Sequence, residues 1–149
     1  MPDDQTRQFD RARPDLSHLQ LAMEGGQLGI WELEPATLRF RWSDNSPEIL
    51  GWAPDDLPET LHDLLDRIVE EDRNEPMRRL TELLEGQTEV DRAEFRILHR
   101  DGGTRWLEAR GRLVETPSGE PIATGTFHNI SDRKQAELEL RASEERLRV

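Results

Sequence analysis

The sequence predicts an α+β fold, in which one five-stranded antiparallel sheet is covered on one face by short helices. Residues 94–114 contain two alternating runs joined by Asp101-Gly102-Gly103, and Asp-Gly between such runs is a strong hairpin signal, because Gly takes positive φ without steric cost. Two further alternating runs, 28–33 and 38–42, are separated by a turn, and a fifth strand follows at 121–131. Helical patterns lie between the two groups of strands, so the elements are segregated as in α+β domains.

The composition indicates one acidic domain with charged appendages. The 149 residues match the size of a single core. A net charge of −12 argues against nucleic acid and anionic lipid as partners, since both require basic surfaces. The chain has no cysteine, which excludes disulfides, thiol catalysis and Cys-bound metals within it and fits a cytoplasmic location. No apolar run reaches 18 residues and the first residues are not a signal peptide, so we expect no membrane segment here.

The N-terminal part is expected to precede the sheet as a tail and a helix. Residues 1–14 are polar and charged, as in a frayed terminus. Residues 15–26 form a predicted flanking helix, because Leu16, Leu19 and Met23 recur at helical spacing before two glycines end the pattern.

The predicted core, residues 27–130, has helices between its two hairpins. Ser46 at the N-cap and Pro47 at the first helical position begin a short helix that Gly51 ends. A second apolar stripe follows the i, i+3, i+4, i+7, i+8 rule at Leu61, Leu64, Leu65, Ile68 and Val69. Residues 72–75 have the spacing of a capping box. The apolar positions of the helix behind it are Met77, Leu80, Leu83 and Leu84.

The C-terminal segment, residues 131–149, is a predicted linker helix with five acidic and five basic side chains. Its residues Ala136, Leu140, Ser143 and Leu147 fall at the 4-3-4 spacing of a parallel coiled-coil seam. We interpret this helix as a dimer-forming element, and an exposed single helix is the alternative.

The sequence resembles a known family, the PAS sensor domain of bacterial signalling proteins. The resemblance rests on Gly29-Ile30-Trp31, Ser46–Gly51, Glu71-Asp72-Arg73, Asp101-Gly102, Trp106–Arg110 and Asn129–Glu137. It covers about residues 16–148 and implies the PAS fold, with a PAC-like C-terminal segment and a signalling helix at 131–149. The family usually ends its last strand with Asp-Ile-Thr, whereas this chain has Asn129-Ile130-Ser131, which keeps hydrogen-bonding groups and loses the charge. We take these three residues as the signal hinge.

Strand alternation assigns an inner and an outer face to the predicted sheet. The inner face and the helices predict a ligand pocket formed by Leu65, Ile68, Leu80, Leu84, Phe95, Ile97, Leu107, Ala109 and Phe127. The outer face and the N-terminal helix predict a dimer surface formed by Leu16, Leu19, Met23, Leu98, Trp106 and His128.

The resemblance also bears on cofactors. Flavin-binding relatives carry amide side chains on the inner strand faces and a reactive Cys, but the aligned residues here are Ile97, Leu107 and Phe127, and Cys is missing. Haem-binding relatives use a His on the long helix before the second hairpin, and residues 72–86 contain none; His62 lies one helix earlier. We therefore predict no flavin and no haem, and leave room for a small apolar ligand.

Catalytic and metal sites are not expected. The sequence shows no nucleophile–base spacing and no Gly-rich phosphate loop. His62, Asp63 and Asp66 can share one side of a helix, but one His with scattered carboxylates is more typical of a solvated surface than of a metal site.

These observations predict a non-catalytic sensory and dimerisation module of a larger bacterial signal-transduction protein. Residues 143–148 resemble the helix that opens a further PAS domain, so we expect an output domain downstream in the same polypeptide, of the histidine kinase or diguanylate cyclase type. Ligand or partner binding would be transmitted through the C-terminal helix of a homodimer. The alternative is a ligand-free structural spacer that mediates dimerisation or protein–protein interaction.

Overall fold

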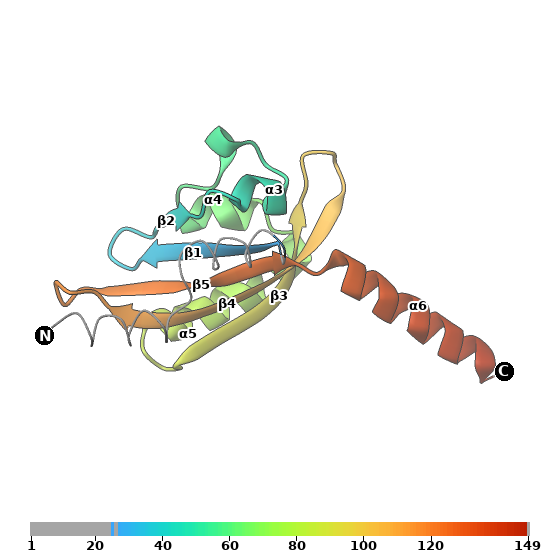
Figure 1. The fold of residues 1–149 in the computed structure, drawn as a ribbon. Coiled ribbons are helices and arrows are strands. Elements are labelled where there is room, and N and C mark those ends of the chain that lie inside the picture. The colour runs from blue at the N-terminus through green and yellow to red at the C-terminus, as the bar shows by residue number, and fades with distance from the viewer. Residues whose placement is uncertain (1–24, 26, 149) are drawn as a thin grey trace, which may run out of the picture.

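The computed structural model describes residue 25 and residues 27–148, and it shows one antiparallel sheet with helices on one side (Figure 1). The strands are β1 (Leu28–Glu34), β2 (Arg39–Trp42), β3 (Val90–Leu98), β4 (Thr104–Glu115) and β5 (Pro121–Asn129). Their order in the sheet is β2-β1-β5-β4-β3, and every neighbouring pair is antiparallel. The predicted five-stranded α+β architecture is therefore confirmed, while the predicted tail and all of the predicted flanking helix except Gly25 lie outside the described residues.

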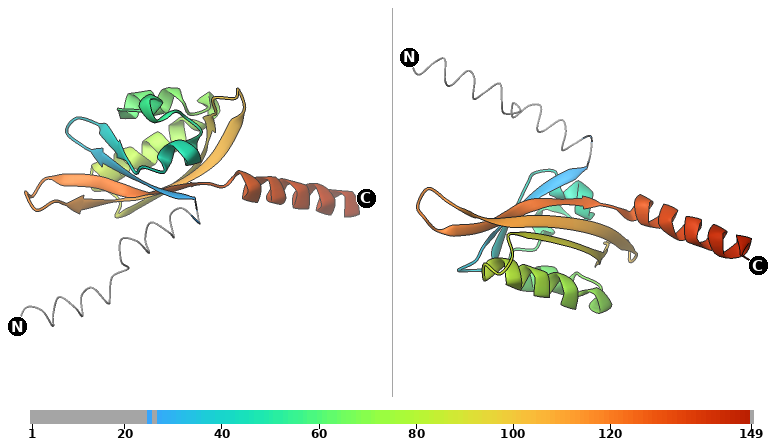
Figure 2. Two further views of the ribbon diagram at one scale, coloured as in Figure 1. Left: turned by 45° about the horizontal axis from the view of Figure 1, so that its top comes forward. Right: turned by 90° about the horizontal axis from the view of Figure 1, so that it is seen from below.

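Three helices connect the first hairpin to the second. They are α3 (Ser46–Leu50), α4 (Leu61–Asp66) and α5 (Asn74–Leu84), with short 3-10 helices at Pro54–Asp56 and Glu70–Asp72. Figure 2 shows these helices gathered on one side of the sheet. The core lies between this helical layer and the inner sheet face, and its largest fully buried aliphatic side chains are Leu33, Leu50, Ile68, Leu83 and Ile97.

The ends of α3 follow local chemistry. Pro47 lies in the first turn, where its missing N–H is not needed. Ser46, predicted as the N-cap, is the first helical residue, and Asn45 takes the cap position without a side-chain cap bond. Gly51 ends the helix at φ 76°, a left-handed conformation that favours glycine, and its N–H donates to the Pro47 carbonyl at 2.8 Å.

The second helical stripe is shorter than predicted. Helix α4 ends at Asp66, and Ile68 leaves it to form a β-bridge with Ile97 at the edge of the sheet. The N–H of Val69 then donates to the Arg96 carbonyl at 2.9 Å. Ile68, at the i+7 position, is buried against β3, although the chain is no longer helical there.

The capping-box prediction at residues 72–75 is wrong. Helix α5 begins at Asn74 after Arg73, which makes no side-chain cap bond. The Asp72 carboxylate instead binds Arg96 of β3.

The register of the second hairpin confirms the predicted strand faces. Phe95 pairs with Leu107, and Ala109 pairs with Phe127, so three neighbouring strands direct apolar side chains to the same layer. At the predicted turn, the Asp101 carboxylate accepts a hydrogen bond from the Gly103 N–H at 2.8 Å.

The last helix, α6 (Ser131–Leu147), projects away from the sheet at the end of β5 (Figure 1). None of its residues is buried, and Leu138, Leu140 and Leu147 are exposed by 56, 61 and 83%. Within the described part of the chain, no helix combines the length and the apolar character that crossing a membrane requires.

Candidate functional site

The space between the helices and the inner sheet face contains an apolar cavity of about 70 Å³. It is lined by Trp31, Phe40, Trp42, Leu50, Leu61, Leu64, Leu65, Ile68, Pro76, Met77, Leu80, Asp91, Ala93, Phe95, Leu107, Ala109 and Phe127. One water molecule needs about 10–15 Å³ in a cavity measured in this way. The cavity therefore has room for a ligand of about five non-hydrogen atoms.

Aromatic rings form one side of the cavity. Phe40 and Trp42 stack with their ring centroids 4.8 Å apart, and Trp42 meets Phe127 edge to face at 5.6 Å. The indole N–H of Trp42 donates to the Pro58 carbonyl at 2.7 Å, and that of Trp31 donates to the backbone carbonyl of residue 126 at 3.3 Å. Both indole donors are thus satisfied by the backbone, and the rings present their carbon surfaces to the cavity.

Seven of the nine residues predicted for a pocket line this cavity: Leu65, Ile68, Leu80, Phe95, Leu107, Ala109 and Phe127. Leu84 and Ile97 do not line it and pack in the surrounding core. The prediction omitted Trp31 and Phe40 of the first hairpin, although the alternation of β1 and β2 was the signal that could have placed them on the inner face.

Asp91 is the only ionisable side chain among the described residues that line the cavity. It shares the inner face of β3 with Ala93 and Phe95, a placement that strand alternation offered and that the pocket prediction missed. Its Oδ1 is buried and has no hydrogen-bond partner in the described part of the chain. Burial raises the pKa of Asp91 to about 6, against the opposing attraction of the Arg79 charge.

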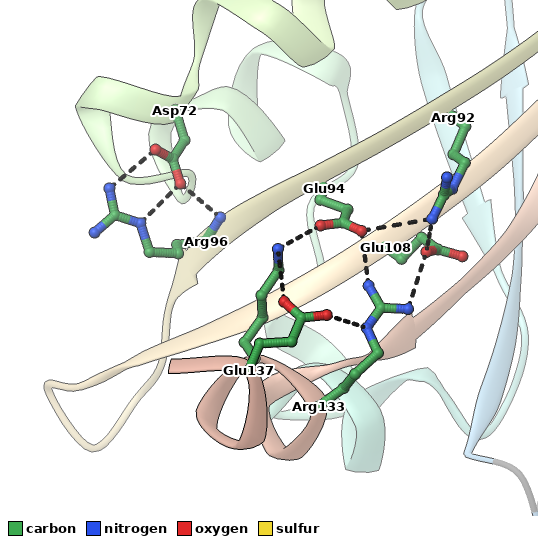
Figure 3. A network of polar contacts seen from close by, with 8 residues as sticks. Asp72, Arg92, Glu94, Arg96, Glu108, Arg133 and Glu137 are labelled. Carbon is green, nitrogen blue, oxygen red and sulfur yellow. Dashed lines mark hydrogen bonds and ion pairs between the residues drawn. The ribbon is translucent and has the colours of Figure 1, made fainter. Parts of the chain in front are cut away.

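The opposite face of the sheet carries a group of charged side chains that joins β3 and β4 to the first turn of α6 (Figure 3). Glu94 binds Lys134 and Arg133, each with an N–O distance of 2.7 Å. Glu108 binds Arg92 at 2.9 Å and lies 3.6 Å from Arg133. We call Arg92, Glu94, Glu108, Arg110, Arg133 and Lys134 the outer-face network.

Glu108 is buried within this network, with its side chain only 2% exposed. The sequence places it on a mixed outer surface, and the burial comes from arginines that arrive from β3, β4 and α6. Burial raises the pKa of Glu108, but hydrogen bonds from Arg92 and Arg110 outweigh it and leave the pKa below its usual value. A hydrogen bond from Lys134 likewise lowers the pKa of Glu94.

A second chain of contacts leads from the cavity wall to α6 through Trp106. Asp72 follows the cavity residue Ile68 and binds the Arg96 guanidinium through both carboxylate oxygens, at 2.8 and 2.9 Å (Figure 3). Arg96 lies over the Trp106 ring at 5.5 Å, and Lys134 of α6 approaches the same ring at 4.9 Å. The hydrogen bond from Arg96 lowers the pKa of Asp72 and keeps this pair charged.

The predicted hinge residues fix the start of α6 to β4. Ser131 Oγ accepts the Trp106 N–H at 2.9 Å, and the N–H of Ile130 donates to the Trp106 carbonyl at 2.9 Å. Asn129 Oδ1 accepts the Ser131 N–H, also at 2.9 Å, so the amide supplies a local turn contact where the family usually has a carboxylate. Ile130 is buried at this junction.

The structure places part of the predicted dimer surface. Leu98 is 45% exposed at the end of β3, whereas Trp106 and His128 are partly buried on the outer face. Leu16, Leu19 and Met23 lie outside the described residues.

The residues that line the cavity include neither a His nor a Cys to bind haem iron. Outside the cavity, His62 lies 3.9 Å from Asp66 on an exposed helix side. No group of three or more potential metal ligands occurs in the parts of the chain that the structure describes.

Comparisons with known proteins agree with this geometry. The family model described as "PAS fold" matches residues 39–128. A blue-light-activated histidine kinase of Brucella ovis is 32% identical over 120 residues, which are 80% of this chain and 23% of the kinase. The sensor protein FixL of Bradyrhizobium diazoefficiens is 29% identical over 132 residues, or 88% of this chain and 26% of FixL. This chain thus spans about a quarter of the length of either relative.

A solved structure shows the same fold. The sensory box histidine kinase/response regulator from Burkholderia thailandensis superimposes with a TM-score of 0.70 at 31% sequence identity. The match covers 87% of this chain and 97% of that one.

Proposed function

Because this chain belongs to the PAS family of sensor domains found in signalling proteins, we propose that it is a non-catalytic sensory and dimerisation module of a larger protein with a histidine kinase or diguanylate cyclase output. In this proposal, occupation of the cavity changes the position of α6, and α6 carries that change to the output domain. A cytoplasmic location belongs to the proposal, and the absence of cysteine fits it.

The observation that carries the proposal is the position of Trp106. Its backbone holds both residues that begin α6, and its ring contacts both the Arg96 guanidinium and the Lys134 ammonium group. Arg96 is in turn bound by Asp72, four residues after Ile68 of the cavity wall. A change at the cavity that moves the Ile68–Asp72 segment therefore acts on the base of α6 through direct contacts.

Hydrogen–deuterium exchange on the chain can test this coupling. Asp72→Asn removes the charge that holds Arg96 and leaves the cavity lining unchanged. We expect the backbone amides of α6 and of the strand segment 104–110 to exchange several-fold faster in this variant, because the contacts of Trp106 loosen. Asp44→Asn, an exposed site with the same chemical change, is the matched control. Faster exchange confined to residues 66–74, with α6 unaffected, would contradict the proposed route.

The proposed dimerisation depends on helix α6. Its apolar residues Leu140 and Leu147 lie at seam positions of the coiled-coil pattern and are exposed in the single chain. Burying them against a second copy would remove apolar surface that water now covers. Sedimentation equilibrium should show a concentration-dependent dimer, and a monomer at all concentrations would refute this part.

A structural spacer is the second candidate, and the small size of the cavity favours it. A spacer would dimerise and would keep the same α6 exchange pattern whether or not small molecules are added. Ligand-dependent exchange in α6 separates the sensor from the spacer.

A further inference from the structure

The buried Oδ1 of Asp91, which has no hydrogen-bond partner among the described residues, is the least expected feature of the cavity. A buried polar atom without a partner is rare in folded proteins, since leaving it unmatched costs about 1–3 kcal/mol, more when the group is charged. Here Oδ1 of Asp91 is buried, and the remaining lining of the cavity is apolar and aromatic. The other residues that line the cavity therefore offer no hydrogen-bond donor or cation to the buried Oδ1 of Asp91.

The basic side chains nearest to Asp91 are engaged elsewhere. Arg79 of α5 donates from Nε to Glu75 at 2.8 Å. Arg92, the next residue along β3, points to the other sheet face and binds Glu108 at 2.9 Å. Asp91 therefore has no ion pair among the described residues, and a ligand cation can supply one.

Aromatic surface surrounds the position where such a cation would lie. Gly111 is the register partner of Asp91, and a Cβ at Gly111 would come within 2.4 Å of the Trp31 ring. The six-membered ring of Trp31 thus fills the space directly across from Asp91. Phe40, Trp42, Phe95 and Phe127 add four more rings to the lining. Carboxylate and aromatic faces together favour an organic ammonium group, because the ring quadrupole attracts a cation and the carboxylate accepts its N–H bonds.

We propose that the cavity binds a small alkylammonium ion, with the ammonium group on Asp91 and the alkyl chain among the aromatic and aliphatic side chains. This inference rests on the proposed sensory function and names the ligand class of the same site. A volume of about 70 Å³ limits the ligand to about five non-hydrogen atoms, the size of butylammonium.

Binding of a cation should depend on pH, because only the ionised carboxylate attracts it. Burial raises the pKa of free Asp91 to about 6. Of the four charged side chains of the neighbouring α5, Arg79, Glu75 and Glu82 act on the pKa of Asp91, and the fourth, Arg78, is paired with Glu75 and Glu82. The adjacent position on β4 is Gly111 and contributes no charge. Since protonation competes with the ligand, affinity should fall by about tenfold between pH 7.5 and pH 5.

The test is a titration of the ¹⁵N-labelled chain followed by NMR, with butylammonium chloride and 1-butanol as probes at matched ionic strength. Butylammonium should produce saturable shifts at the Trp31 indole and at Asp91, with an affinity at least about tenfold above that of the neutral alcohol. Asp91→Asn should abolish this preference, and Asp44→Asn, the exposed control, should retain it. Should Asp91→Asn fail to fold, the pH dependence of the wild-type affinity provides the same discrimination.

Three outcomes would overturn the inference: equal affinity for both probes, a preference that survives Asp91→Asn, or no saturable shift at cavity residues with either probe. Equal affinity would still be compatible with sensing of a neutral ligand, so it overturns the ligand class alone. The proposed coupling to α6 is judged separately, by the exchange of the Asp72→Asn variant, which requires no ligand.

Discussion

Replacing Asp91 by Asn should stabilise the chain at neutral pH in the absence of any ligand. In the folded state the pKa of Asp91 is about 6, compared with 3.8 for an unperturbed Asp. The native state therefore holds the proton more tightly than the unfolded state, and the free energy of unfolding falls as the pH rises from about 4 to about 6. Above about pH 7 the penalty of the buried charge is fully present.

The difference between the two pKa values sets the magnitude. At 1.36 kcal/mol per unit, it corresponds to an upper limit of about 3 kcal/mol. Asp91 retains some contact with solvent, which reduces the expected effect to about 1–2 kcal/mol. Asn has nearly the same shape and no charge, so Asp91→Asn should unfold at a higher urea concentration than the wild type at pH 7.5. At pH 4, where Asp91 is largely protonated, the two proteins should differ little.

Urea unfolding followed by tryptophan fluorescence at both pH values measures this directly. The exposed control Asp44→Asn should change the free energy of unfolding by less than about 0.5 kcal/mol at either pH. An Asp91→Asn effect of the same size and sign at pH 4 and pH 7.5 would refute the reasoning, because it would show that the charge of Asp91 is not the cause. Destabilisation at pH 7.5 would refute it as well.

Three further predictions concern the rest of the molecule. Glu108→Gln should lower the free energy of unfolding by about 1–2 kcal/mol in chemical denaturation, because a buried carboxylate that binds arginines from three elements loses its charge. Replacing Leu140 and Leu147 by Lys should convert the expected dimer to a monomer in sedimentation, without lowering the thermal stability of the sheet domain, since both side chains are exposed in the single chain. Gly51→Ala should destabilise by about 1–3 kcal/mol in thermal unfolding, as φ is 76° and the new Cβ would meet the His99 ring.

The fold was predictable because its signals are local. Alternation indicated the inner faces of β3, β4 and β5, and the turn at residues 101–103 indicated how β3 pairs with β4. Seven of the nine residues predicted for a pocket line the cavity, and the four of them on the sheet were found from this alternation of inward and outward side chains. It also placed Asp91 on the inner face, but a single carboxylate at the start of a strand is read from sequence as solvated unless the register is known.

The missed features are contacts between residues far apart in the chain. Asp72 has the spacing of a capping residue, yet its carboxylate binds Arg96, 24 residues later. Ile68 continues a helical pattern, yet pairs with Ile97 as a β-bridge. The burial of Glu108 depends on Arg133 of a different element. Spacing along the chain does not indicate such pairs, because the two residues of each pair become neighbours only in the folded protein.

Strand β3 joins the two proposals in one element. Its inner side chain Asp91 borders the cavity, and the next residue, Arg92, points to the other face and binds the buried Glu108. Successive residues of a strand rise by only about 3.3 Å and project to opposite faces. Under the two proposals, a ligand that draws the Asp91 carboxylate into the cavity would also move the backbone that positions Arg92 and Glu94. Glu94 holds Arg133 and Lys134 at the base of α6. In these proposals, ligand recognition and helix position both depend on residues 91–94 of one strand, so a signal would not need to cross the core to reach the helix.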